Sequence, residues 1–113
     1  MEINHEIING IQVITMRGRF DAPAAPDAER LFKELLQHGM TRVILDLTGV
    51  EYISSGGLRV IIMLTKALEK IQGDLKLCGL SPFVSEVFKI TNLARRYDIC
   101  PTRDEALALF SES

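Results

Sequence analysis

The sequence predicts an α/β protein whose elements follow the order ββαβαβαβα, and three observations predict this class. Short apolar runs of strand composition alternate with longer segments in which apolar residues recur every three or four positions, as on one face of a helix. An Asn-Gly dipeptide joins the first two runs, as in a tight hairpin. Glycine or proline marks most of the later boundaries. Strands that alternate with helices form a sheet with mostly parallel or mixed strands.

The first three elements are a hairpin and a helix. Asn9-Gly10 is expected to turn a hairpin over residues 6–14, and its second strand continues to Phe20. Asp21 follows as an N-cap or turn residue. A helix is expected over Asp27–Gly39, because its apolar residues fall on one face and the glycine stops it.

The central elements are a strand, a helix and a strand. Residues 42–47 form an almost continuous apolar run, which is typical of a strand buried on both faces. The next helix should run from Ser55 to about Gln72 and stop at Gly73. Residues 74–78 then form the fourth strand.

The last elements are set by capping signals. Ser81 is the expected N-cap of a helix that has Pro82 in its first position. Residues 96–100 resemble a short final strand. Thr102 and Glu105 form a capping box that opens the last helix.

Size and charge limit the classes of function. A chain of 113 residues is long enough for one domain, expected over residues 1–113, that needs neither disulfide nor metal. Its 13 Lys and Arg residues are spread without a cluster and its net charge is −2, which argues against nucleic acid or an anionic membrane as the main partner. No apolar run could span a bilayer, and the first residues lack the features of a signal peptide. Cys78 and Cys100 have no CxxC spacing, so we expect reduced, buried cysteines in a cytoplasmic protein.

The most informative segment is residues 46–58, where the third strand delivers two serines and two glycines to the start of a helix. Ser54, Ser55, Gly56 and Gly57 are all small, which leaves their backbone amides accessible to an anion. The start of a helix has unpaired N–H groups and the positive end of the helix dipole. A phosphate on one of these serines would therefore be tolerated, and the segment indicates a regulatory phosphoserine rather than a catalytic centre.

The helix that follows divides into two sides at about 100° per residue. One side is expected in the core: Gly57, Val60, Ile61, Leu64, Ala67, Leu68 and Ile71. The other is expected to face solvent: Ser55, Arg59, Ile62, Lys66, Glu69 and Lys70. Ile62 is then either an unremarkable exposed apolar residue or part of a partner-docking face with Arg59, extended by Met63 at its edge.

Signals for catalysis, cofactors and metals are absent from the sequence. No GxSxG elbow surrounds the serines, and no histidine is near them in sequence. Gly56-Gly57 is not followed by the Lys-Ser/Thr of a phosphate-binding loop, and no spacing of His, Cys or carboxylates suggests a metal. Asp21 and Asp46 could each come near the serines in the fold, or each could serve only a cap or a turn.

The chain resembles the STAS domain family, specifically the single-domain bacterial anti-sigma-factor antagonists. The resemblance covers nearly the whole chain and rests on residues 43–58, 77–82 and 102–107, together with Gly18-Arg19-Phe20-Asp21. It implies a STAS-type mixed β-sheet with helices packed mainly on one face. In the family the central motif reads Asp-Ser-Ser/Thr-Gly-Leu, and a partner kinase phosphorylates the first serine or threonine after the aspartate. That position is Ser55, with Asp21, Ser54, Gly56 and Gly57 as its surroundings.

Two departures from the family motif bear on the phosphosite. The aspartate position is Ser54, and the residue after the acceptor is Gly56 rather than a hydroxyl residue. The first change removes a negative charge beside the phosphosite. It also leaves Ser54 as a second candidate acceptor.

The resemblance implies a mechanism based on charge. The unphosphorylated form would bind an anti-sigma serine kinase with a GHKL-type ATPase fold and so release the sigma factor. Phosphorylation of Ser55 would add about −1.5 to −2 charge to the docking face and break the interface. A metal-dependent serine phosphatase would reset the switch, whose output is transcription, secretion or motility. Two other hypotheses stay open: a STAS scaffold that senses a nucleotide or other anion at the Ser54–Gly57 turn, and a small enzyme with Ser55 as nucleophile.

Overall fold

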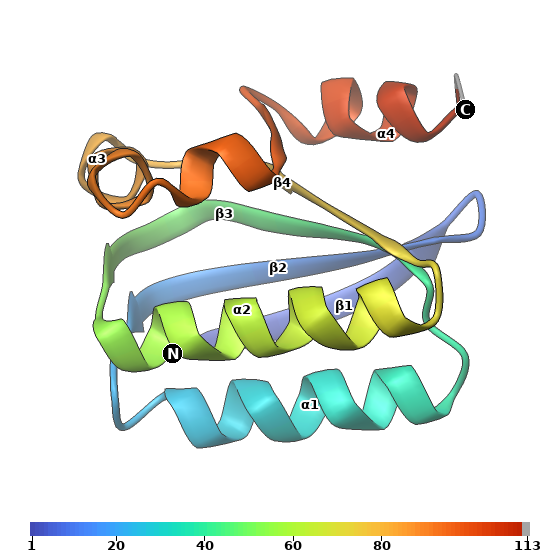
Figure 1. The fold of residues 1–113 in the computed structure, drawn as a ribbon, viewed down its shortest axis with the longest axis horizontal. Helices are drawn as coiled ribbons and strands as arrows, with labels where there is room; N and C mark the ends of the chain where they lie inside the picture. The colour runs from blue at the N-terminus through green and yellow to red at the C-terminus, as the bar shows by residue number, and fades with distance from the viewer. Residues whose placement is uncertain (112–113) are drawn as a thin grey trace.

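The computed structural model describes residues 1–111, which form a mixed five-stranded sheet between layers of helices (Figure 1). The strands are β1 (Glu2–Ile8), β2 (Ile11–Phe20), β3 (Arg42–Ile53), β4 (Asp74–Cys78) and β5 (Asp98–Cys100). They lie in the order β1-β2-β3-β4-β5, with β1 antiparallel to β2 and every other pair parallel. The predicted ββαβαβαβα order is confirmed.

Three of the four helices contribute to one large core. The helices are α1 (Ala25–Gln37), α2 (Ser55–Lys70), α3 (Pro82–Ile90) and α4 (Arg103–Ser111), with a 3-10 turn, η1, at Leu93–Arg96. Buried side chains of α1, α2 and α3 join Val43, Leu45 and Leu47 of β3 in this core. The alternate β3 residue Ile44 belongs to a second, smaller core covered by α4. In Figure 1, α1 and α2 lie along one side of the sheet and α4 lies on the other, with α3 beside β3 at the same side of the view as α4. The buried side chains of α3 nevertheless belong to the large core, so three of the four helices share it.

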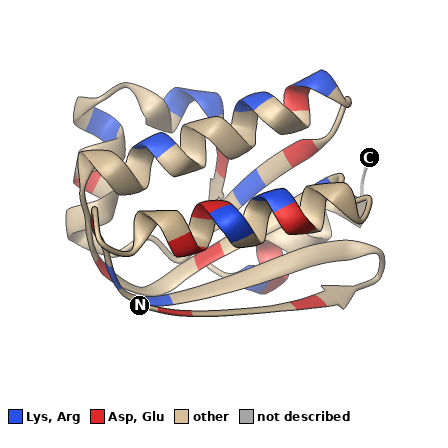
Figure 2. Ribbon diagram, turned by 90° about the horizontal axis from the view of Figure 1, so that it is seen from below, with Lys and Arg blue, Asp and Glu red and all other residues tan. Residues whose placement is uncertain are grey.

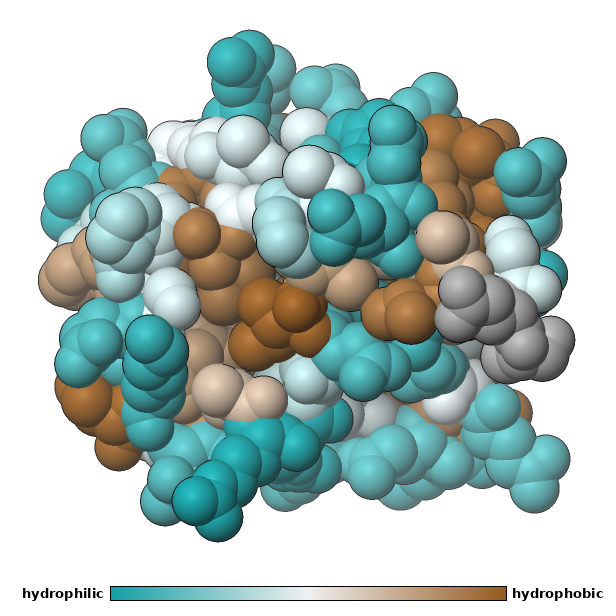
Figure 3. All heavy atoms as spheres, turned by 90° about the horizontal axis from the view of Figure 1, so that it is seen from above, coloured by the Kyte–Doolittle hydropathy of each residue, from teal (hydrophilic) through white to brown (hydrophobic). Residues whose placement is uncertain are grey.

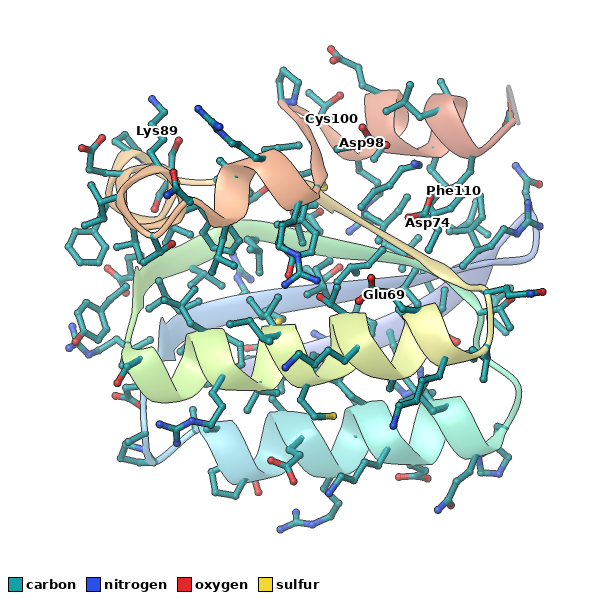
Figure 4. The ribbon with its side chains drawn as sticks, in the orientation of Figure 1. Glu69, Asp74, Lys89, Asp98, Cys100 and Phe110 are labelled. Carbon is teal, nitrogen blue, oxygen red and sulfur yellow. The ribbon has the colours of Figure 1, made fainter. Side chains whose placement is uncertain are left out.

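α4 is held to the sheet by a buried lysine. The ammonium group of Lys76 on β4 lies 3.0 Å from the carboxylate of Asp74 and 2.8 Å from that of Asp98. The same nitrogen lies 4.6 Å from the centre of the Phe110 ring of α4, and Figure 4 labels Phe110 together with Asp74 and Asp98. The cation therefore links two strands and a helix.

The two cysteines lie under the same helix. Cys78 and Cys100 are register partners on β4 and β5, and both are buried free thiols in the smaller core. On the face seen in Figure 3, apolar side chains reach the surface across the middle of the view and are bordered by hydrophilic ones. Within the described residues, no helix is both long enough and apolar enough to cross a bilayer.

Several element boundaries differ from the sequence-based expectation, and the first strand begins at Glu2 rather than at residue 6. β3 does not end at Leu47 but continues to Ile53, because the long strand β2 keeps pairing with it as far as Phe20. The predicted strand 96–100 shrinks to Asp98–Cys100, since the residues before it form η1. The extension of β3 comes from its pairing with β2, which local composition does not report.

Candidate functional site

Ser54 joins the end of β3 to the start of α2. Its backbone N–H donates to the carbonyl of Phe20 at 3.0 Å, and its side-chain oxygen accepts the N–H of Gly57 at 3.3 Å. The hydroxyl also lies 3.5 Å from the Phe20 carbonyl, to which it donates. Ser54 is therefore the N-cap of α2 and is half-buried. Because aspartate caps helices as well as serine does, Ser54 can take over the structural role of the aspartate in the family motif.

Ser55 is the first residue of α2 and is exposed. Nothing in the described part of the chain hydrogen-bonds to its hydroxyl, whereas the hydroxyl of Ser54 is engaged on both sides. The two adjacent serines thus differ in availability. The positive end of the α2 dipole lies at Ser55, and a phosphate there would be favoured locally.

The two glycines after the serines have different roles. A Cβ on Gly57 would clash with the Phe20 carbonyl oxygen, so α2 can approach β2 this closely only with glycine at this position. A Cβ on Gly56 would meet its nearest atom, the Cα of Ala22, at an ordinary 3.4 Å. Gly57 therefore sets the packing of the turn, and Gly56 contributes small size at the surface.

Asp21 lies at the same end of the sheet as the serines, one residue after the Phe20 carbonyl that holds Ser54. Its side chain accepts the N–H of Ala24 at 3.2 Å and lies 3.8 Å from Arg19. The helix begins at Ala25 rather than at Asp27, and Asp21 is a turn residue rather than the N-cap. Ser54, Gly56 and Gly57 therefore adjoin Ser55 in the turn, whereas the Asp21 side chain contacts Ala24 and Arg19 at the same end of the sheet.

Asp46 is not part of this site. It points to the α4 side of the sheet, where its carboxylate accepts two hydrogen bonds from Arg103, at 3.2 and 3.1 Å, and two from Thr48. Burial raises its pKa, but the hydrogen bonds from Thr48 and Arg103 outweigh burial, so the pKa lies below its ordinary value. Asp46 therefore anchors α4 rather than the serine turn.

The predicted docking face is only partly exposed. Arg59 faces solvent one turn after Ser55, but Ile62 and Met63 are half-buried against the core, so the prediction of an exposed Ile62 is wrong. Ile71, predicted in the core, is 48% exposed, because α2 ends at Lys70 and Ile71 leaves the helical path. Ala67, also predicted in the core, is half-buried.

Two neighbouring features were not foreseen from the sequence. Thr65 is buried on α2, where its hydroxyl lies 2.7 Å from that of Tyr97. At the serine end of the sheet, the Arg19 guanidinium lies 4.1 Å from the centre of the Tyr52 ring, and this ring stacks on exposed Phe83 at 5.4 Å. Arg19 and Tyr52 meet because they are partners in the β2–β3 register, and this register has no local sequence signal.

The arrangement suits modification of one exposed hydroxyl. His5 and His38 line a separate hollow at the far end of α1 from Gly56. Within residues 1–111, no group of three or more His, Cys, Asp or Glu side chains could hold a metal ion. The Gly57 N–H already donates to the Ser54 side chain, so it is not available to bind an anion at the turn.

Comparison with known proteins gives one consistent family. The STAS domain family matches residues 2–106. BtrV of Bordetella bronchiseptica, named as a candidate anti-sigma factor antagonist, is 34% identical over 110 residues, which cover 97% of this chain and 95% of BtrV.

Solved structures agree with this family. A candidate anti-sigma factor antagonist from Thermotoga maritima superimposes with a TM-score of 0.88 at 27% identity, covering 94% of this chain and 92% of that one. The Bacillus cell fate determinant SpoIIAA in its phosphorylated form has the same fold, with a TM-score of 0.79, 21% identity and coverage of 96% and 99%. The mixed sheet, the serine turn and these matches together establish that the chain belongs to the STAS domain family.

Proposed function

We propose that this protein is an anti-sigma-factor antagonist that works by partner switching, a regulator rather than an enzyme. Unphosphorylated, it binds a GHKL-type anti-sigma serine kinase and so releases the sigma factor. Phosphorylation of Ser55 switches it off, and a metal-dependent serine phosphatase restores it. The switch operates in the cytoplasm.

The observation that carries the proposal is the contrast between the two serines. Ser55 presents an exposed hydroxyl at the start of α2, whereas Ser54 is half-buried and caps the helix. A kinase must bring the acceptor hydroxyl in line with the γ-phosphate, which requires a hydroxyl that protrudes. The similarity to BtrV supports the same function, and so does the existence of a phosphorylated form of SpoIIAA, a protein of this fold.

The physical consequence of phosphorylation is local. A phosphate at the first residue of α2 is compatible with the helix dipole, so the domain should stay folded. The added charge lies one helical turn from Arg59, on the face proposed to dock the kinase with Ile62 and Met63. Repulsion and the cost of desolvating the phosphate then break the complex.

The test is phosphorylation in vitro with matched serine variants. The protein is incubated with ATP and each GHKL-type serine kinase encoded by the same organism, and the modified residue is mapped by mass spectrometry. Phosphate on Ser55 in the wild type and in Ser54→Ala, but none in Ser55→Ala, supports the proposal. Phosphate on Ser54 alone overturns the assignment, and no transfer from any of these kinases overturns the switch.

A binding measurement tests the mechanism. Ser55→Asp should bind the kinase less tightly than the wild type does, and Ser55→Ala should bind it constitutively. If Ser55→Asp unfolds the protein, the switch works through stability and the charge mechanism is wrong. Saturable binding of ATP or GTP at the Ser54–Gly57 turn without any kinase would instead favour the anion-sensing alternative.

A further inference from the structure

The seam between α1 and α2 forms an apolar groove with a basic rim. The groove measures about 590 Å³. Its apolar residues are Leu36, Ile62, Met63, Ala67 and Ile71, and its charged residues are Arg59, Lys66 and Lys70. Among the described residues, no acidic side chain lines it. An apolar floor bordered by charged residues that are all positive is typical of a binding surface rather than of a solvated helix face.

The groove continues toward the serine turn. A second hollow, of about 610 Å³, lies along the same seam and shares Arg59 with the first. It reaches Gly56, beside Ser55, and its charged residues from α1 are Glu29, Arg30 and Lys33. Figure 2 views this side of the molecule and shows the two helices side by side, with Lys and Arg predominating along α2. The two hollows form one surface, which we call the α1–α2 groove.

The cations of α2 are available for a partner. Arg30 and Lys33 already pair with Asp27 and Glu29 on α1, at 3.1 and 2.7 Å. In contrast, Arg59, Lys66 and Lys70 form no ion pair within the described part of the chain. The whole chain has a net charge of −2, so this positive charge is local to the α1–α2 groove.

The apolar floor is also incompletely covered by this chain. Ile71 is 48% exposed at the end of α2, and Ile62 and Met63 are only half-buried. Val60, Ile61 and Leu64 of α2 are buried in the core, whereas Ile71, just past the end of the helix, lines the open groove. The 13 residues of α1 and 16 of α2 correspond to a seam of roughly 20 Å at about 1.5 Å per residue. An open groove of this length suits a helix of three to four turns.

We propose that the α1–α2 groove binds an acidic amphipathic helix of a protein partner. Apolar side chains of that helix, spaced i, i+3, i+4 and i+7, contact Ile62, Met63 and Ile71. Its flanking carboxylates pair with Arg59, Lys66 and Lys70. If the partner is the kinase, the inference deepens the proposed function, but binding in the groove itself requires neither ATP nor a phosphate on Ser55.

The test uses a synthetic peptide in place of the partner. A fluorescein-labelled 14-residue helical peptide carries leucine at the four spaced positions and glutamate beside them. Fluorescence anisotropy measures its affinity for the intact protein, and amide chemical shifts locate the contact. Two control peptides replace every glutamate by lysine or every leucine by serine. We expect binding only of the glutamate–leucine peptide, shift changes along α1 and α2, and weaker binding at high salt.

Matched charge reversals identify the cations. Lys66→Glu with Lys70→Glu should weaken peptide binding at least tenfold. Lys89→Glu with Arg95→Glu changes the charge equally but on α3 and η1, and Figure 4 shows Lys89 on the opposite side of the molecule from α1. This control should change affinity less than twofold. Circular dichroism melts confirm that both double variants are folded.

Three outcomes would overturn the inference: equal binding of the lysine peptide, shift changes confined to another surface, or equal effects of the two double variants. The result is independent of the phosphorylation test, because the peptide experiment contains neither kinase nor ATP. Failure of phosphate transfer to Ser55 would leave the groove intact as a binding surface. Failure of peptide binding would leave the serine switch intact.

Discussion

The side-chain oxygen of Ser54 accepts the N–H of Gly57 at 3.3 Å and so closes the first turn of α2. The neighbouring Ser55 makes no comparable contact in the described residues, and its side chain is exposed. The two serines therefore have separate roles: one holds the helix start, and the other is available at the surface. This division makes their variants informative.

Replacing each serine by alanine should affect stability differently. Ser54→Ala removes the cap and should lower the free energy of unfolding by about 1 kcal/mol, within the range of 0.5–2 kcal/mol for such caps. Ser55→Ala should change it by less than about 0.5 kcal/mol, because its side chain is exposed. Urea denaturation of the two variants beside the wild type measures both. Equal losses would contradict the assignment of Ser54 as the cap.

The two glycines provide a second matched pair. Gly57→Ala should destabilise the fold by about 1–3 kcal/mol, since its Cβ would clash with the Phe20 carbonyl oxygen. Gly56→Ala should be neutral or stabilising by up to about 1 kcal/mol, because alanine is the better helix former and space exists for it. Thermal melts of both variants check the prediction. A Gly57→Ala protein as stable as the wild type would show that α2 does not need this close approach.

Asp46 should make stability depend on acid. Its folded pKa is lowered from 3.8, so its ionised form stabilises the fold above about pH 4, and this contribution is lost as the pH falls through the lower folded pKa. Asp46→Asn should therefore be less stable than the wild type at neutral pH, and the difference should shrink below about pH 4. Chemical denaturation from about pH 2 to 7 follows it. A difference that stays constant over this range would contradict the linkage.

Arg103→Ala should lower the free energy of unfolding by about 1–3 kcal/mol. The substitution leaves the largely buried carboxylate of Asp46 without two hydrogen bonds. Arg30→Ala is the matched control, since its pair with Asp27 is 74% exposed on both sides and should contribute little. Urea denaturation at neutral pH compares them. Equal effects would mean that the Asp46–Arg103 contact does not anchor α4.

Adjacent isoleucines on α2 separate folding from binding. Ile61 is fully buried, and Ile61→Ala should cost roughly 2–5 kcal/mol of stability. Ile62 is half-buried at the groove, so Ile62→Ala should cost about 1 kcal/mol or less. Under the proposed function, Ile62→Ala should also weaken kinase binding by about 1 kcal/mol or more. Parallel melting and titration experiments test both effects, and unchanged kinase affinity would move the docking face away from Ile62.

Local signals in the sequence predict much of the fold. The strand over residues 74–78 is confirmed, and Ser81 caps α3 by accepting the N–H of Val84 at 3.4 Å. The N–H of Glu105 donates to the Thr102 side chain at 3.3 Å, as the capping box predicts. A short strand or a helix cap depends on a few adjacent residues, so the sequence alone is enough to predict it. The full length of β3 depends on its pairing with β2, a distant strand, so local signals do not predict it. The 3-10 turn η1 was not predicted either.

The sequence likewise predicts some features of the candidate site and misses others. Helical rotation from the sequence indicates that Ser55 faces outward, and the structure agrees; phosphorylation of Ser55 stays a prediction. The same rotation fails at Ile62, because α1 lies close enough to cover part of an otherwise outward-facing residue. It also misses Thr65, whose hydroxyl is satisfied by Tyr97, 32 positions away. Sequence periodicity fixes the direction of a side chain, but not what lies in that direction.

Cys78 and Cys100 lie opposite each other on β4 and β5, beneath α4, as free thiols. They can therefore serve as a native probe of the opening of this C-terminal helix. Burial, reinforced by the charge of Asp46, raises the pKa of Cys78 to about 12, so the reactive thiolate is scarce while α4 is closed. Cys78 is fully buried in the core that α4 covers, so a thiol reagent should reach it when α4 separates from the sheet. The alkylation rate therefore reports the free energy of this sub-global opening, without any engineered label.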